Sequence, residues 1–484
     1  MLQTLKNAWN TKEIRSKLLF TLFILLIYRV GTVVPVPFVE ANDFAASLDG
    51  TILQYMDVLS GGSLGAMTLF ALGVQPYINA SIIIQLLAVV FPKLGELAKN
   101  DKKKMTFITR IVTVVLALVT AIGYYFLLKN GSGDIETFLT RSAFEGKGAW
   151  FYAIVIIACY CAGASLIMWL AERINEKGLG NGISMILFAN IVAAVPSFVY
   201  KLMAVVVGTY SYVNKPWLYA IISTLFAIVL IAGLLALIGV VIWFTGSERR
   251  IPIQYAKKVV GRKMYGGQSS NLPIKLNMTG VMPIIFASSI VSFVPTILQV
   301  CESAGAYDEA SGWATFADII GVNGVIYPVM LFLLIIGFTY FYTQITFDPM
   351  EVSNNLKRQG GAIPGIRQGR PTADYIKKIL GKITLAGALF LALIAVIPQI
   401  LGPHVFQHFF EWIIEGAYVG TWIEQIFGLD SAYLQSLVAS NASSLVSIFS
   451  FGGTTLLIVV GVAVETFREL EAQLTMRNYK GFLN

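Results

Sequence analysis

Ten long apolar stretches dominate this chain of 484 residues. Each has roughly the 20 residues that a helix needs to cross the hydrocarbon core of a bilayer. Inside lipid the backbone must satisfy its own hydrogen bonds, so stretches of this kind form helices. We therefore predict an all-α membrane protein with ten transmembrane helices in one bundle. The stretches lie at about 18–34, 74–91, 105–128, 151–170, 183–200, 217–244, 281–300, 325–346, 383–401 and 445–464.

Lys and Arg residues alternate from loop to loop. They cluster in the N-terminal arm and in the loops at 93–104, 245–277 and 347–382. The loops at 35–73, 301–324 and 402–444 contain acidic residues and no Lys or Arg, and only 129–149 and 201–216 break the pattern. The positive-inside rule then predicts a multi-pass protein of the cytoplasmic membrane with both termini in the cytoplasm. The formal charge of +8 reflects this cytoplasmic excess and does not require nucleic-acid binding.

The chain offers little for catalysis or metal binding. Cys159 and Cys161 are better explained as small apolar residues than as metal ligands. His404 and His408 have a spacing that suits zinc on a helix, but no third type of ligand clusters near them. No nucleophile–base pair or carboxylate pair is recognisable. We predict that the protein is not an enzyme and has no metal site and no cofactor.

Ionisable residues are rare within the apolar stretches. Arg29 lies toward the outer end of the first stretch, and Glu465 lies at the inner end of the last. A charge at the centre of the bilayer costs about 2.5–3.5 kcal/mol, so we expect both side chains near an interface or facing the bundle. A secondary transporter, the main alternative function, usually has carboxylates near the middle of the membrane. An integral-membrane enzyme is a weaker alternative, because it would need clustered His, Asp or Glu.

The region before the second long stretch is interrupted. Residues 63–72 are apolar but too short to span a bilayer, and they follow Gly61 and Gly62. Gly73 and Pro76 separate them from the next helix, as glycine and proline commonly do. We predict a short re-entrant half-helix lodged within the bundle. The alternative is an amphipathic segment on the outer surface.

Several strings of residues resemble those of one family. They are Ala71–Leu87, Gly178–Ser184, Asn277–Ser289, Ile363–Arg367 and Phe451–Val459. Their sequences and their order resemble the SecY family, the channel subunits of the bacterial Sec protein translocase. The resemblance covers nearly all of the chain except 402–444, which is longer than is usual in the family.

This resemblance implies a protein-conducting channel for unfolded polypeptides, built from two inverted halves of five helices around a central pore. The halves would be 1–202 and 203–484, with a plug at 61–73 that closes the outer funnel. The plug would include Gly61, Gly62, Ser63, Leu64, Met67, Leu69 and Phe70. The family's pore ring corresponds here to Val74, Ile78, Ile183, Leu187, Ile285 and Ile458. All six are aliphatic, and a narrow apolar constriction can gate by excluding water.

The resemblance also implies a lateral gate and docking surfaces. The gate would involve Asn79 and Phe293, with polar neighbours Ser81, Ser288, Ser289 and Ser292 across the seam. Through it, signal sequences and transmembrane segments would pass into membrane lipid. The segments 245–277 and 347–374, within the cytoplasmic loops 245–277 and 347–382, would receive the ribosome or the SecA motor ATPase. The docking residues would be Arg249, Arg250, Arg262, Lys263 and Arg367. Small SecE-like and SecG-like membrane subunits are expected partners.

The segment 402–444 is the hardest to interpret. Its apolar and aromatic residues, such as Phe406, Phe409, Trp412 and Trp422, suit a membrane interface, whereas Glu411, Glu415 and Glu424 interrupt it. We predict an outer amphipathic helix or hairpin along the membrane surface. An additional pair of spans is the alternative.

Overall fold

The structure is a computed structural model. It describes residues 2–40, 44, 48, 52–130, 138–140, 149–211, 216–255, 258–260, 263–265, 269–303, 312–321, 324, 326–400 and 452–480. The predicted amphipathic element at 402–444 lies outside the described residues, as do His404, His408 and Arg262. Those predictions therefore stay predictions.

Each of the ten apolar stretches coincides with a long helix. These helices are α2 (Lys12–Gly31), α5 (Gln75–Val90), α7 (Lys102–Asn130), α9 (Ala149–Lys177), α10 (Gly182–Ser211), α11 (Pro216–Gly246), α12 (Met282–Ser303), α14 (Ile326–Thr346), α16 (Arg370–Ile400) and α20 (Gly452–Lys480). The first seven residues of the last stretch, 445–451, lie outside the described residues. Helix α10 continues past residue 202, so the predicted boundary between the halves falls inside a helix rather than between two.

Five helices in the described part of the chain are long and apolar enough to cross a membrane. Helices α5 and α6 (Pro92–Asn100) are bent by 117° relative to each other. If the two together form one broken span, they add a sixth. The break has a local cause. A residue before proline is disfavoured in the helical region, and Phe91, which precedes Pro92, has extended backbone with φ −102° and ψ 108°.

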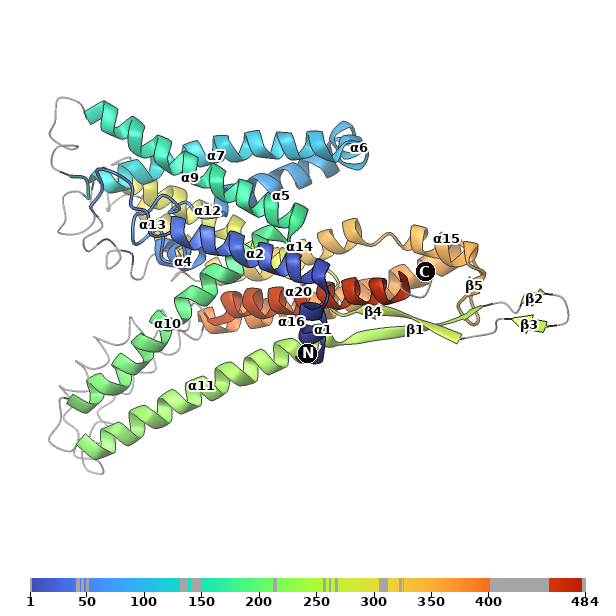
Figure 1. Ribbon diagram of the computed structural model, residues 1–484. Helices are drawn as coiled ribbons and strands as arrows, with labels where there is room; N and C mark the ends of the chain where they lie inside the picture. Colours follow the sequence, from blue (N-terminus) through green and yellow to red (C-terminus); the bar gives the residue numbers. More distant parts are fainter. Residues whose placement is uncertain are drawn as a thin grey trace.

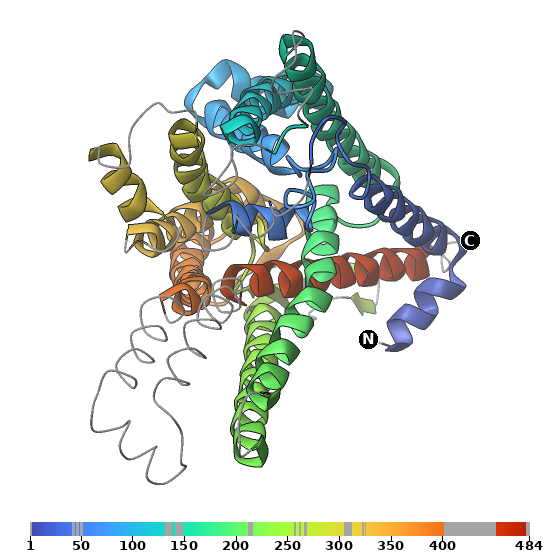
Figure 2. The same cartoon turned by 90° about the vertical axis from the view of Figure 1, so that its left-hand side faces the viewer.

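The helices form a bundle with one large apolar core (Figure 1). Helices α5, α7 and α9 pack side by side, and α12, α14 and α16 form a second group. Helix α20 runs through the middle, where it contacts α10, α11, α12 and α16 (Figure 2). The core of the bundle therefore lies where several helices from both parts of the chain meet.

The basic loops lie together at one end of the bundle. Figure 1 shows α6, α15 (Pro349–Arg358) and the strands at this end, whereas α4 (Ile52–Ser60) and α13 (Gly312–Ile320) lie toward the opposite end. Helix α1 (Leu2–Asn10) packs against α20 through a small cluster that contains Ala8 and Leu470. The alternation of charge along the sequence thus corresponds to two ends of the molecule.

A small sheet joins two of the basic loops, which the sequence analysis did not predict. Its strands are β4 (Ser269–Lys275), β1 (Glu248–Tyr255) and β5 (Gly361–Ala362), in that order and antiparallel. A separate hairpin comprises β2 (Lys258–Val260) and β3 (Lys263–Tyr265). In β1, Ile251 and Ile253 are buried and alternate with exposed residues, the pattern of a strand with one covered face. They pack against Leu356 and Ile376 of α15 and α16, so the two loops share one apolar core.

The glycine-rich turn 178–182 connects α9 to α10 and is held by side-chain caps. Asn175 Oδ1 accepts a hydrogen bond from the Gly182 backbone N–H at 2.7 Å, and Thr21 Oγ1 accepts one from Leu179 N–H at 3.0 Å. A Cβ atom on Gly182 would strike the carbonyl oxygen of Ala171. The glycines therefore serve a tight connection between the two helices.

A bidentate ion pair ties α7 to α9. Arg110 Nε lies 3.0 Å from Glu172 Oε1, and Arg110 Nη2 lies 2.6 Å from Glu172 Oε2. Glu172 is only 8% exposed, whereas 47% of the Arg110 side chain is accessible. Bidentate geometry makes this the strongest kind of side-chain ion pair. Removing one partner leaves the other charge without compensation.

We predict that Arg110→Gln and Glu172→Gln each lower the free energy of unfolding by about 1–3 kcal/mol. The double variant R110Q/E172Q should lose clearly less than the sum of the two, because it leaves no uncompensated charge. Thermal unfolding of the purified protein in detergent measures all three. If the two single effects simply add in the double variant, the pair makes no coupled contribution.

Candidate functional site

The segment 61–73 consists of consecutive turns rather than the half-helix that we predicted. The cause lies in its backbone. Gly61, Gly62, Met67 and Gly73 all have positive φ, between 48° and 83°, and such residues cannot continue a right-handed helix. The segment is nevertheless buried within the bundle, as expected. The side chains of Ser63, Leu64, Met67 and Phe70 are all buried, whereas a segment on the outer surface would expose part of its side chains.

Neighbouring helices hold this segment at several points. The Phe70 ring stacks on Tyr28, with ring centres 5.4 Å apart, and lies where a Cβ on Gly31 would be. The carbonyl group of Leu69 lies against Gly163 of α9 so closely that a Cβ there would collide with it. These glycines in α2 and α9 therefore make room for the segment.

Backbone hydrogen bonds complete this fixation. Val36 N–H donates to the Met67 carbonyl at 3.2 Å, and Leu69 N–H donates to the Val34 carbonyl at 2.9 Å. The side chain of Asp57 in α4 adds a further bond, since its Oδ1 accepts from Gly65 N–H at 2.7 Å. Irregular backbone at membrane depth must find its partners within the protein. These bonds supply them.

The six aliphatic residues assigned to the pore ring all belong to one contiguous apolar cluster. None is more than 7% exposed. They come from four places in the chain: the residue before α5 and α5 itself (Val74, Ile78), α10 (Ile183, Leu187), α12 (Ile285) and α20 (Ile458). Leu64, Met67 and Phe70 of the 61–73 segment belong to the same cluster. All six therefore lie in the apolar core of the bundle, as does this segment, and their arrangement as a ring stays a prediction.

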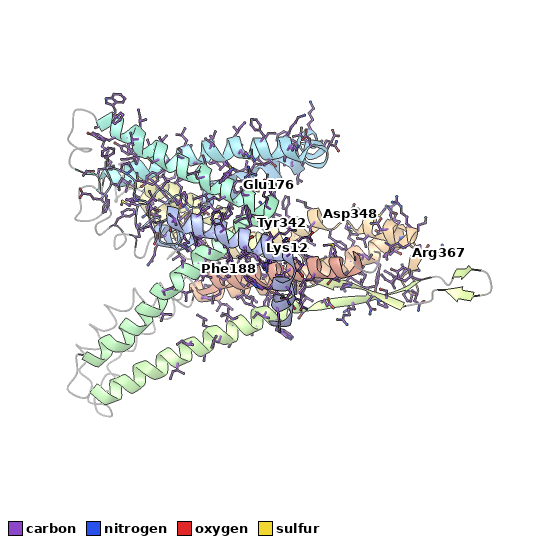
Figure 3. All side chains as sticks on the ribbon, viewed as in Figure 1. Lys12, Glu176, Phe188, Tyr342, Asp348 and Arg367 are labelled. Carbon is purple, nitrogen blue, oxygen red and sulfur yellow. The ribbon has the colours of Figure 1, made fainter. Side chains whose placement is uncertain are left out.

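The seam between α5 and α12 carries the residues assigned to the lateral gate. Asn79 and Phe293 are both half-buried on these two packed helices. The hydrogen bond that crosses the seam, however, joins Gln75 Nε2 to Ser292 Oγ at 3.4 Å. Gln85 Oε1 accepts a hydrogen bond from the Tyr342 hydroxyl of α14. Tyr342, labelled in Figure 3, is half-buried.

Sequence reasoning missed Gln75, Gln85 and Tyr342. The available signal was the presence of Gln75 and Gln85, in addition to Asn79, in a largely apolar helix, since such groups hydrogen-bond across membrane helices. The serines behave differently from our expectation. Ser288 and Ser292 donate to carbonyl groups of their own helix, at 3.0 and 3.1 Å, so only the acceptor side of Ser292 serves the seam.

The basic end of the bundle presents part of the assigned docking residues. Arg249 and Arg250 are exposed on β1, and Arg250 Nε lies 2.7 Å from Glu248 Oε1. Of Lys263, only the backbone position in β3 is described. Lys275 is the last residue of β4. Burial and the nearby positive charge of Arg468 lower the pKa of Lys275, whereas the negative charges of Glu248 and Glu465 act in the opposite direction.

A tight turn positions Arg367. Ile366 N–H donates to the Ile363 carbonyl at 3.1 Å, and Gly365 has φ +80°. Proline followed by a glycine of positive φ is the pattern of a type II turn. Ile363 is buried in the apolar core shared by the two loops, which anchors the turn. Arg367 itself is exposed and lies at the basic end of the bundle, near the strands (Figure 3).

The described residues contain no group of three or more His, Cys, Asp or Glu that could hold a metal ion. Cys159, Cys161 and Cys301 are free thiols. What the site offers is therefore an aliphatic cluster, a buried irregular segment, a polar seam and a basic face.

Comparisons with known proteins agree on one family. A sequence model of the SecY family matches residues 68–467. Protein translocase subunit SecY of Streptomyces coelicolor is 36% identical, and the alignment covers 100% of both chains. SecY of Streptomyces galbus is 37% identical and that of Mycobacterium tuberculosis 36%, again over 100% of both chains.

Solved structures show the same fold. A protein-conducting channel superposes with a TM-score of 0.58 at 15% identity, covering 95% of this chain and 92% of the other. A SecY protein whose plug domain maintains the membrane seal gives 0.55 at 15% identity, with the same coverage. Sec61 in a canine ribosome–channel complex gives 0.55 at 14% identity, covering 95% and 92%.

We predict that Gly163→Ala destabilises the protein although alanine favours helix. The added methyl group would push against the Leu69 carbonyl, and such overpacking costs about 1–3 kcal/mol. Gly233→Ala is the matched control, because nothing lies within 4 Å of its Cβ position in α11. Thermal unfolding in detergent should show a lower midpoint for G163A and an unchanged midpoint for G233A. An unchanged midpoint for G163A would mean that the 61–73 segment does not press on α9.

Proposed function

The chain belongs to the SecY family, and on this premise we propose that it is the central protein-conducting channel of a bacterial Sec translocase. It is a channel subunit and not an enzyme, and family membership excludes the transporter and membrane-enzyme alternatives. It passes unfolded polypeptides across the cytoplasmic membrane and releases transmembrane segments sideways into lipid. The observation that carries this proposal is the burial of the six aliphatic residues assigned to the pore ring in the same apolar core that contains Leu64, Met67 and Phe70 of the 61–73 segment.

The six aliphatic residues act as the constriction of the pore. An apolar neck of this kind excludes water and ions when no polypeptide occupies it. It also presents no fixed dipole that would hold a passing peptide. Aliphatic side chains have the flexibility to close around segments of different bulk, which keeps the membrane sealed during translocation.

The segment 61–73 acts as the plug. In support, its apolar side chains belong to the same cluster as the constriction, while its backbone is held by Val34 and Val36 rather than by a regular helix. A loop held by individual contacts can leave its site without unfolding a helix. The two five-helix halves that surround it would meet between Ser211 and Pro216, where α10 ends and α11 begins.

The seam between α5 and α12 acts as the lateral gate. An apolar segment that leaves the pore through it gains about 25 cal/mol per Å² of surface removed from water. The gate is closed by the Gln75–Ser292 hydrogen bond, and the bond from Tyr342 of α14 to Gln85 holds α5 from a second helix. A hydrogen bond between membrane helices contributes on average only about 0.6 kcal/mol, so the seam is weak enough to open.

The basic end faces the cytoplasm and receives the driving partners, the ribosome or SecA. Arg249, Arg250 and Arg367 are suited to phosphate groups or acidic protein surfaces because they are exposed and positively charged. Arg262 and Lys263 would extend this face. With the basic loops in the cytoplasm, both termini lie there too. SecE-like and SecG-like subunits complete the complex in the membrane.

We predict that Ile78→Asn and Ile285→Asn increase ion conductance and let defective signal sequences through, since an amide hydrates the constriction. Ile78→Leu and Ile285→Leu should behave almost as the unchanged protein, because the wall stays apolar. Conductance across planar bilayers and export of a client with a defective signal measure both effects. Equal effects of Asn and Leu would assign these residues to packing instead of to a pore.

We predict that Arg367→Glu abolishes most translocation without loss of the protein from the membrane, because it inverts the charge of an exposed docking contact. Membrane vesicles that carry the whole complex, with the motor and a secretory client added, provide the assay for the proposed function. Lys177→Glu is the control, since it makes the same charge change at another exposed position. Normal translocation by R367E would remove Arg367 from the docking surface. Equal loss in K177E would indicate a general charge effect.

A further inference from the structure

Arg29 has no role in the function described so far, although an arginine within an apolar stretch is costly. It lies in the last turn of α2. Its Nη2 donates to the carbonyl group of Ala189 in α10 at 2.5 Å, and its Nη1 donates to the carbonyl group of Gly61 at 3.4 Å. The guanidinium therefore connects α2, α10 and the first residue of the plug.

Asn190, next to Ala189, makes a parallel connection. Its side chain is completely buried, and its Nδ2 donates to the Leu59 carbonyl at 2.7 Å and to the Tyr28 hydroxyl at 2.9 Å. The Tyr28 hydroxyl in turn donates to the Ser60 carbonyl at 3.5 Å. Tyr28 and Arg29 of α2 and Asn190 of α10 thus reach three consecutive carbonyl groups of the chain, those of residues 59–61.

Residues 59–61 are the place where α4 ends and the plug begins. Gly61 has φ +74°, and a Cβ on it would lie 2.9 Å from Asn190 Oδ1 and 3.0 Å from Arg29 Nη1. The two side chains therefore close directly over the Gly61 backbone. Gly62 also has positive φ, at +83°, but nothing lies within 4 Å of its Cβ position. The close approach is specific to residue 61.

We propose that Arg29 and Asn190 form a latch on residues 59–61 that holds the plug in its closed position. The latch rests on the proposed function, since it requires that 61–73 is a plug. Both are positioning residues: they hold backbone carbonyl groups and do not contact the translocating polypeptide.

The geometry suits a contact that must also release. Two of the bonds, at 3.4 and 3.5 Å, are at the long end of the hydrogen-bond range. Asn190 Oδ1 is buried without a hydrogen-bond partner among the described residues, which makes the closed arrangement less favourable than a fully paired one. Movement of the plug away from the constriction would break the contacts to 59–61 and leave the Arg29–Ala189 bond between α2 and α10 intact.

The test measures ion leak through the assembled complex in planar bilayers without a client. Arg29→Gln and Asn190→Ala should each raise the leak about tenfold, since each removes hydrogen bonds of the closed state. Arg29→Lys keeps the positive charge and can still donate a hydrogen bond to one of the two carbonyl groups. Its leak should therefore stay close to that of the unchanged protein. The double variant R110Q/E172Q is the control, because it removes charges from the same half of the bundle without touching residues 59–61.

A second pair of variants leaves both latch residues unchanged. Gly61→Ala places a methyl group against Asn190 and Arg29, whereas Gly62→Ala introduces the same kind of backbone strain in open space. We expect a larger leak from G61A than from G62A. Equal leaks from the two, in complexes that assemble normally, would overturn the latch.

Deletion of residues 63–72 separates failure of the latch from failure of the proposed function. If that deletion raises the leak and Arg29→Gln adds nothing to it, the latch acts through the plug, as proposed. If the deletion raises the leak but R29Q and N190A alone do not, the latch is wrong and the plug stands. Full additivity of R29Q and the deletion would also overturn the latch. An unchanged leak after the deletion would contradict the plug itself and with it the latch.

Discussion

Irregular backbone can exist inside a helical membrane bundle only where the protein itself satisfies its polar groups, and much of this structure follows from that constraint. The 61–73 segment meets it through backbone bonds to Val34 and Val36 and through the Asp57 carboxylate. The surrounding helices also accommodate the segment. Gly31 and Gly163 leave space where the segment approaches, and Asn190 satisfies the carbonyl group of Leu59. The buried segment 61–73 therefore makes demands on residues of three helices, α2, α9 and α10, that do not belong to it.

Much of the fold could be predicted from the sequence, because the requirement for apolar helices of bilayer length leaves few alternatives. All ten long helices coincide with predicted stretches. The burial of 61–73 followed from its glycines and its length. Its conformation did not, since Met67 adopts a positive φ that no residue-type rule would assign to methionine. The sheet was missed because its signal is a single short alternation, Ile251 and Ile253, in a loop interpreted only by charge.

The candidate site was predictable to the extent that it depends on residue type. The six aliphatic residues assigned to the constriction are all buried in the apolar core, which their residue type alone makes predictable, whereas their arrangement as a ring stays a prediction. The polar contacts were less accessible, because a hydrogen bond depends on which rotamers two helices permit once they pack. Ser292 accepts from Gln75 across the seam, whereas the hydroxyl groups of Ser288 and Ser292 donate to their own helix. Sequence alone indicates that a polar group lies at the seam, but not which partner it finds.

The central claim is that a translocating polypeptide passes between the six aliphatic residues. A photo-crosslinking side chain at Ile285 and, in a separate variant, at Ile167 tests it most directly, with a client polypeptide arrested in the assembled channel. Both residues are buried in the same apolar cluster, but Ile167 lies on α9 and is not assigned to the constriction. The account predicts crosslinks to the client from Ile285 and none from Ile167. Equal crosslinking from both positions, or crosslinking from Ile167 alone, would contradict it.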